Sequence, residues 1–246
     1  MAYAEDPIKI KLGTMEGEEA DIWKVAVEQA KKDGLDIEIV TFSDYALPNE
    51  ALNSGDIDAN AFQHKPYLDA QIEQRGYRLA IAGHTMLTPI GIYSHKIKNI
   101  KDLRDGSIVG IPNDPSNGGR ALRLLSDLGL VKLKNPDDVF ATKLDIIDNP
   151  KKLQVRELDA GILGQALNDF DIAIINTNWA LTVGLDPNQD ALLFEKARNN
   201  PYDNIIVVRQ QDADKPWVKK LVAAYQNEVV RAKIKQVFGA SAQTSW

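Results

Sequence analysis

Apolar and polar positions follow two periods along this chain, one of two residues and one of about 3.6. Ile8 to Leu12 alternates apolar residues with lysine, which predicts a strand, and apolar residues recur at helical spacing from Ala20 to Ala30 before Gly34 ends the helix. The same criteria predict further strands at 35–42, 57–61, 77–82, 107–111, 153–158, 171–175, 192–195 and 205–208. They predict further helices at 49–54, 65–75, 120–128, 162–168 and 216–238.

Strands that alternate with helices predict α/β architecture, with mostly parallel sheets covered by helices. Two stretches, 50–58 and 165–173, share Ala-Leu-Asn and Asp-Ile at identical spacing, which indicates two lobes built to one plan. We expect lobe one to comprise 1–89 plus 205–246 and lobe two to comprise 90–204, joined by a hinge of two crossings. A ligand cleft is expected between the lobes.

Composition narrows the possible functions. The chain has 246 residues, a net charge of −6 and scattered lysines and arginines, so a nucleic-acid-binding surface is not expected. It has no cysteine, which excludes disulfides and thiolate metal sites, and no apolar run of about 18 residues. Ala2-Tyr-Ala4 is similar to the end of a secretory signal, and the same three residues also fit chance or a cloned start.

The segment Pro112 to Arg120 follows a predicted strand, where α/β folds bind ligands. A helix is expected to begin near Arg120, with its amide N–H groups and positive dipole end available to an anion. Arg120 itself offers two parallel hydrogen bonds to a carboxylate, and Asn113 and Asn117 offer polar groups. The alternative is a well-capped helix with a solvated arginine.

Two further segments occupy equivalent positions. Asn176 and Asn178 follow the strand 171–175, and their amides can accept from an ammonium group and donate to a carboxylate; a simple turn is the alternative. Aromatic side chains gather near the end of the corresponding strand in lobe one, where they could enclose an apolar ligand group or simply pack in the core. These are Tyr45, Phe62, His64 and Tyr67. For His64 a structural hydrogen bond is expected rather than catalysis.

Signatures of catalysis are lacking. The chain contains no Gly-x-Ser-x-Gly, no phosphate-binding loop, no His-Glu-x-x-His and no dinucleotide-binding glycine pattern. Its three histidines, at 64, 84 and 95, have no partners at metal-ligand spacing. We therefore expect neither an enzyme nor a cofactor or metal.

Four longer motifs carry a resemblance to a known family. They are Asp44-Tyr-Ala-Leu-Pro-Asn-Glu-Ala-Leu52, Gly55-Asp-Ile-Asp-Ala-Asn-Ala-Phe-Gln-His-Lys-Pro-Tyr67, Ile111-Pro-Asn-Asp-Pro-Ser-Asn-Gly-Gly-Arg120 and Ile174-Ile-Asn-Thr-Asn178. In this order they closely resemble the NlpA lipoprotein family, the methionine-binding proteins of bacterial ABC importers. The resemblance runs from about Ile8 to the C-terminus and implies a two-lobed periplasmic-binding-protein fold of type II.

The resemblance also implies roles for individual residues. Arg120 would hold the ligand carboxylate, and Asn117 and Asn178 would contact the amino-acid head group. The aromatic segment would hold the thioether side chain, and Tyr202 lies in a further matching segment. The implied ligand is L-methionine, and often D-methionine, which the protein would deliver as a monomer to a permease complex in the inner membrane.

One departure concerns the N-terminus, because the family usually begins with a lipidated cysteine and this sequence has none. A periplasmic or extracytoplasmic location is expected, with a lipid anchor if a cysteine precedes this chain. Two alternatives stay open. One is a binding protein for a related amino acid or a methionine-containing dipeptide, and the other is an enzyme on the same scaffold.

Overall fold

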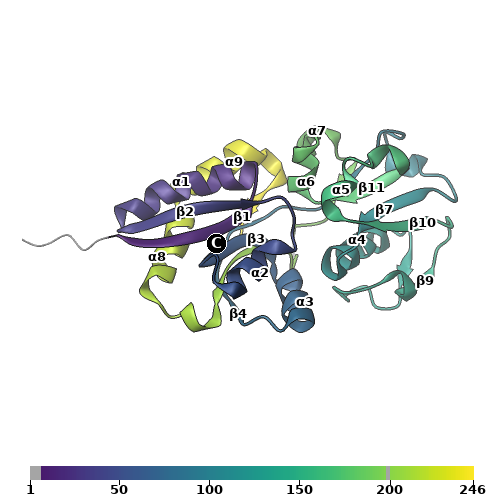
Figure 1. Ribbon diagram of the computed structural model, residues 1–246. Coiled ribbons are helices and arrows are strands. Elements are labelled where there is room, and N and C mark those ends of the chain that lie inside the picture. The colour runs from purple at the N-terminus through teal and green to yellow at the C-terminus, as the bar shows by residue number, and fades with distance from the viewer. Residues whose placement is uncertain (1–6, 198–199) are drawn as a thin grey trace, which may run out of the picture. The chain divides into compact units, whose positions relative to one another are not determined.

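A computed structural model describes residues 7–197 and 200–246 (Figure 1). The chain forms two compact units. Unit 1 comprises 1–87 and 201–246, and unit 2 comprises 88–200, whereas the boundaries expected from the sequence were 89 and 204. Each unit has its own sheet and helices, which confirms the prediction of two α/β lobes. Within the described ranges, no helix is long and apolar enough to cross a membrane.

The sheet of unit 1 is mixed rather than wholly parallel. Its strands lie in the order β2-β1-β3-β13-β4. β1 pairs in parallel with β2 and β3, and β13 runs antiparallel between β3 and β4. Their bounds are β1 (Ile8–Met15), β2 (Leu35–Phe42), β3 (Ala59–His64), β4 (Leu79–His84) and β13 (Asn204–Arg209).

Helices cover this sheet, and α1 packs against both C-terminal helices, with the rings of Trp23 and Tyr225 4.7 Å apart. The bounds are α1 (Glu18–Lys32), α2 (Leu47–Ser54), α3 (Lys65–Arg75), α8 (Pro216–Tyr225) and α9 (Glu228–Phe238). The region 216–238 is helical, as predicted, and it is divided into two helices. Asn227 lies between α8 and α9, where its side chain accepts from the amides of Val229 and Val230 and starts a new helix. Short elements complete unit 1: β5 (Met86–Leu87) paired with β14 (Gln243–Thr244), and the 3-10 turns η4 (Gln210–Asp212) and η5 (Gly239–Ser241).

The sheet of unit 2 repeats this plan. Its order is β10-β7-β11-β6-β12, with β7 parallel to β10 and β11, and β6 antiparallel to both β11 and β12. The antiparallel strand therefore takes the fourth position in both sheets. β3 and β11, which accompany the two copies of the sequence repeat, both take the third. The bounds are β6 (Gly91–Tyr93), β7 (Ile108–Pro112), β10 (Gln154–Leu158), β11 (Ile172–Ile175) and β12 (Leu193–Phe194).

Unit 2 has an aliphatic core built on β6, β7 and β11, which includes Ile92, Ile111 and Ile174. Its helices are α4 (Pro115–Asp127), α5 (Ala160–Leu163), α6 (Thr177–Thr182) and α7 (Pro187–Asp190). The smaller elements are η1 (Ile100–Asp102), β8 (Lys132–Leu133), η2 (Lys143–Asp145), β9 (Ile146–Asp148) and η3 (Leu167–Asp169).

Helix α4 begins five residues before the predicted start at Arg120, at Pro115. Asp114 caps it by accepting from the amide of Asn117, and Pro115 takes the first helical position, which suits its missing N–H. The glycines that suggested a loop have a packing role. A methyl group on Gly119 would lie 2.4 Å from the carbonyl oxygen of Val139. Arg120 is therefore in the second turn of the helix and not at its N-terminus.

Two other expectations needed correction. The second copy of the repeat was predicted to form one helix over 162–168, but it forms α5 and η3, with Gly164 packed so closely against Val183 that a Cβ would lie 2.8 Å from a methyl group. The strand predicted at 57–61 lies at 59–64, because Asp58 instead accepts from the amide of Lys11 and turns the chain.

Candidate functional site

The predicted site residues form two clusters, one on each unit. The aromatic cluster in unit 1 comprises Tyr45, Phe62, His64, Tyr67 and Tyr202. Ring centroids of Tyr45, Phe62 and Tyr67 lie 5.8–6.0 Å apart, and those of His64 and Tyr202 lie 5.0 Å apart. All but the half-buried Tyr45 are at most 6% exposed. Edge-on and tilted packing of this kind forms a rigid apolar wall.

His64 fastens this cluster to the backbone, as the sequence predicted. It is the N-cap of α3, and its Nδ1 accepts from the amide of Tyr67 over 3.2 Å. An accepting Nδ1 carries no hydrogen, so the neutral ring carries its proton on Nε2. The hydroxyl of Tyr67 donates to the carbonyl oxygen of Tyr45 over 2.8 Å and so joins the loop before α2 to α3.

A buried ring of three amides joins the same strand, β3, to α2. Asn49 of α2 exchanges hydrogen bonds with Gln63 of β3, at 2.8 and 2.6 Å, and both Asn60 and Gln63 donate to Oδ1 of Asn49. All three side chains are at most 2% exposed. Each amide orientation is set by the other two, so the ring fixes where β3 presents Phe62 and His64.

The polar cluster in unit 2 comprises Asp114, Asn117, Arg120 and Asn176, with Glu195 against Arg120. The carboxylate of Asp114 accepts from Nδ2 of Asn117, at 3.2 Å for Oδ1 and 3.0 Å for Oδ2. Oδ1 of Asn117 must then accept, and it does so from Nδ2 of Asn176 over 3.0 Å. The Oδ1 of Asn176 ends this series of hydrogen bonds. It is buried and has no hydrogen-bond partner among the described residues.

This chain of bonds has a fixed direction, from a carboxylate through two amides to an acceptor. Burial raises the pKa of the Asp114 carboxyl, and the hydrogen bonds from Asn117 and Ser116 oppose that rise. The negative end thus polarises both amides toward Asn176 Oδ1. A buried acceptor in this position is matched to a cationic donor such as an ammonium group.

Arg120 lies one helical turn after Asn117, on the same face of α4. Its Nε donates to Oε1 and Oε2 of Glu195, at 2.9 and 3.1 Å, and its Nη2 donates to Glu195 and to the carbonyl oxygen of Thr88. Because Arg120 is 3% exposed, the alternative of a solvated arginine does not hold.

The remaining predicted residues flank this cluster. Asn178 is the half-buried second residue of α6, and Asn113 is exposed between β7 and the cap of α4. Asn176 and Asn178 do not form the simple turn that the alternative described, since Asn176 occupies the N-cap position of α6, without a side-chain capping hydrogen bond, and Asn178 lies within the helix. Sequence reasoning missed Asp114, which the Asp-Pro pair at a helix start could have revealed. It also missed Glu195, whose partner is 75 residues away.

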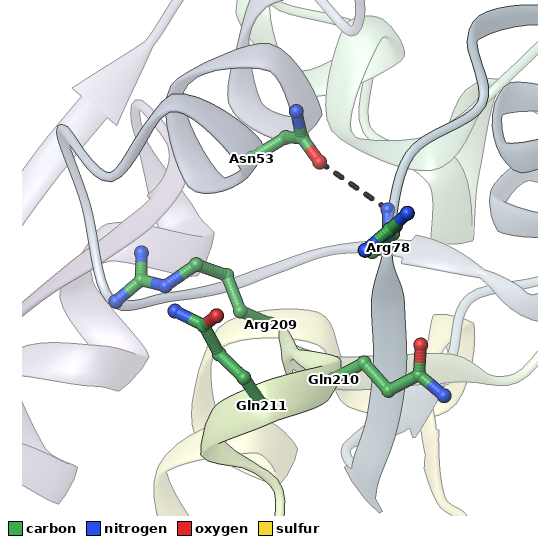
Figure 2. Close-up of a pocket in the computed structure, with 5 residues that line it drawn as sticks. All are labelled: Asn53, Arg78, Arg209, Gln210 and Gln211. Atoms are coloured by element: carbon green, nitrogen blue, oxygen red, sulfur yellow. Dashed lines mark hydrogen bonds between the residues drawn. The ribbon is translucent and has the colours of Figure 1, made fainter.

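A separate pocket of about 360 Å³ opens on unit 1 between α2, β4 and η4 (Figure 2). Asn53 accepts there from the amide of Arg78. The Arg209 guanidinium, however, donates to Asp58, Asp212 and the carbonyl oxygens of Leu52 and Ile57. These bonds join the turn after α2 to β13, which is a structural role. Across the described ranges, no group of three or more His, Cys, Asp or Glu side chains is placed to hold a metal ion.

Comparisons with known proteins agree with the resemblance. The chain matches the NlpA lipoprotein family over residues 10–246. It is 49% identical to the D-methionine-binding lipoprotein MetQ of Escherichia coli strain K12 over 245 residues, which cover 98% of this chain and 90% of the relative.

Solved structures give the same result. A nutrient-binding protein from Burkholderia cenocepacia, solved bound to methionine, superposes with a TM-score of 0.93 and 50% identity, covering 96% of this chain and all of that chain. A periplasmic substrate-binding protein of an ABC transporter from Coxiella burnetii gives a TM-score of 0.92 and 46% identity, with 96% and 100% covered. All three are binding proteins, and the one from Coxiella burnetii belongs to an ABC transporter. This chain belongs to the NlpA lipoprotein family.

Proposed function

We propose that this protein is the extracytoplasmic methionine-binding protein of an ABC importer, and that it captures its ligand without chemical conversion. The polar cluster of unit 2 carries the proposal. Asn176 Oδ1 is a buried acceptor suited to an ammonium group, and Arg120, on the same face of α4 as Asn117, is a donor suited to a carboxylate. Together they are complementary to the head group of an α-amino acid.

The aromatic cluster of unit 1 supplies the complement to the side chain. Faces and edges of Phe62, Tyr67 and Tyr202 suit the polarizable sulfur of methionine, whose contacts with aromatic rings are favourable. In this proposal Asn113 and Asn178 of unit 2 lie beside the head group. The names of the relatives, which include D-methionine-binding lipoproteins and a methionine-bound structure, support the choice of methionine.

The expected contributions to the binding free energy are large enough for tight binding of methionine. Burying a methionine side chain contributes about 1.5–3 kcal/mol. Each charge-assisted hydrogen bond to the head group contributes about 1.5–3 kcal/mol. These contributions can exceed the entropic cost of holding one small ligand. The proposed partner of the monomer is the permease of the importer. If a cysteine precedes this chain, a lipid anchor on that cysteine holds the protein at the membrane.

The test is direct. The protein is purified without refolding, any bound small molecule is identified by mass spectrometry, and L- and D-methionine are titrated calorimetrically into the stripped protein. Methionine recovered from the protein and bound with sub-micromolar affinity supports the proposal. Recovery of a dipeptide or another amino acid, with weak methionine binding, contradicts it. Turnover of a bound amino-acid derivative would contradict the non-enzymatic role.

A further inference from the structure

Glu195 neutralises Arg120 inside unit 2 before any ligand arrives. The side chains are 3% and 9% exposed, and the carboxylate binds both Nε and Nη2 of the guanidinium. Oε1 of Glu195 also accepts from the amide of Ile90 over 3.0 Å, which fixes the carboxylate independently of Arg120. The carboxylate therefore belongs to the built framework of the cluster.

The pair changes which ligands the cluster favours. With Arg120 positive and Glu195 negative, the two groups sum to zero, and Asp114 adds either nothing or a further negative charge. A ligand with a carboxylate alone would bring an uncompensated negative charge into a buried neutral site, which is costly. A zwitterion adds no net charge, and its ammonium group meets Asn176 Oδ1.

We propose that Glu195 determines specificity by setting the net charge around Arg120, so that the site selects zwitterionic amino acids over simple carboxylates. The inference rests on the proposed function and adds a residue that the sequence analysis did not select. Removing the charge of Glu195 makes the cluster around Arg120 more positive by one unit, which favours any carboxylate. The selectivity for the ammonium group then falls, even where methionine still binds.

The experiment compares two ligands with the same carboxylate and thioether, L-methionine and 4-(methylthio)butanoate, which lacks the ammonium group. Calorimetry measures both dissociation constants for the wild type and for Glu195→Gln, which keeps the shape and loses the charge. The dissociation constant of 4-(methylthio)butanoate divided by that of methionine is expected to fall about 10-fold or more in Glu195→Gln, since the Coulomb energy of a nearby unit charge grows as the local dielectric constant falls.

Two further variants separate charge from position. Glu195→Asp keeps the charge and is expected to retain a ratio close to that of the wild type. Glu157→Gln removes an equal charge from an exposed ion pair with Lys143 of the same unit, and the ratio is expected to stay unchanged. A merely structural role predicts instead that both ligands weaken together in Glu195→Gln, with the same ratio, and that result overturns the inference.

The wild type alone provides a test that needs no variant to fold. Binding of 4-(methylthio)butanoate as tightly as methionine contradicts selection by charge. Failure of the wild type to bind methionine at all contradicts the proposed function and removes the basis of this inference. Methionine binding combined with an unchanged ratio in Glu195→Gln contradicts the role of Glu195 alone, so the two failures are distinguishable.

Discussion

Asn176 donates a hydrogen bond from Nδ2 to Oδ1 of Asn117 over 3.0 Å, although 59 residues separate them in the chain. The bond joins the end of β11 to the first turns of α4. Its direction is dictated by Asp114, which accepts from the other end of the Asn117 amide. The orientation of Asn176 is thus set by a carboxylate that it does not contact.

Replacing Asn176 tests this acceptor. Asn176→Ala is expected to weaken methionine binding about 10- to 100-fold, because it removes a hydrogen bond to a charged group worth about 1.5–3 kcal/mol. The helix start should survive, since the side chain of Asn176 does not cap α6. Calorimetry gives the affinity and circular dichroism the fold. Asn168→Ala, on the exposed surface of the same unit, is the control, and equal losses in both variants would count against the acceptor.

Removing Arg120 should cost stability as well as binding. Arg120→Ala leaves the buried Glu195 carboxylate uncompensated, which is expected to lower the free energy of unfolding by about 3–5 kcal/mol. The double variant Arg120→Leu/Glu195→Leu should recover most of this loss, since no charge stays buried. Urea denaturation measures both. Lys143→Ala is the control, because it breaks an exposed ion pair with Glu157. It should lower the free energy of unfolding by less than about 1 kcal/mol. Additive losses in the double variant would argue against the pair.

The buried amide ring is expected to be intolerant of an apolar replacement. Asn49→Leu removes three hydrogen bonds from the ring and leaves Oε1 of Gln63 without its donor, which should destabilise unit 1 by about 1–3 kcal/mol. Chemical denaturation measures the loss. The control is Asn53→Leu, which changes an exposed asparagine of the same helix. An equal loss of unfolding free energy in this control would contradict the stabilising role of the amide ring.

Glu19 gives the protein a pH-dependent stability. Its side chain is 7% exposed, and burial, with a smaller contribution from the charge of Glu18, raises its pKa from 4.5 to about 8. The folded state therefore holds a proton that the unfolded state releases above pH 4.5. Stability from this group is complete below about pH 4.5 and is lost as the pH rises through about 8, with a slope of at most about 1.4 kcal/mol per pH unit.

Thermal or urea unfolding from pH 5 to 9 checks the sign. Glu19→Gln is expected to remove most of this decline, because a neutral amide has no proton to lose. Glu28→Gln on the same helix, where the side chain is 65% exposed, should keep the wild-type slope. Identical pH profiles for the wild type and Glu19→Gln would refute the assignment.

The close approach at Gly119 predicts a cost for a single methyl group. In Gly119→Ala the new Cβ would lie 2.4 Å from the carbonyl oxygen of Val139, so α4 or the segment near Val139 must move. The expected loss of unfolding free energy is about 1–3 kcal/mol. Gly161→Ala places a methyl group 3.2 Å from the flexible Asp159 side chain and should cost less. The reverse ranking in a denaturation series would contradict the packing argument.

Local signals in the sequence were sufficient for much of the fold. β2 and α3 have the predicted bounds, 35–42 and 65–75, because hydrophobic periodicity and the glycines at 34 and 76 agree there. Phe62, His64 and Tyr67 of the aromatic cluster were predictable, since they lie close together along β3 and α3. The position of Arg120 in α4 was not, because Pro-Ser-Asn-Gly-Gly has the composition of a turn, and only tertiary packing against Val139 explains glycine in that helix. Glu195 could not be recognised, since its role depends on a contact made across unit 2.

The position of β13 also has a consequence for synthesis on the ribosome. This strand lies between β3 and β4 in the sheet of unit 1, yet it is encoded after the whole of unit 2. When residues 1–87 leave the ribosome, β3 and β4 lack the strand that pairs with both of them. Unit 2 is continuous in sequence and can fold as it emerges. Unit 1, whose first strands precede unit 2 in the chain, is therefore completed after unit 2, and a nascent chain stopped before 204–209 lacks the strand that pairs with β3 and β4.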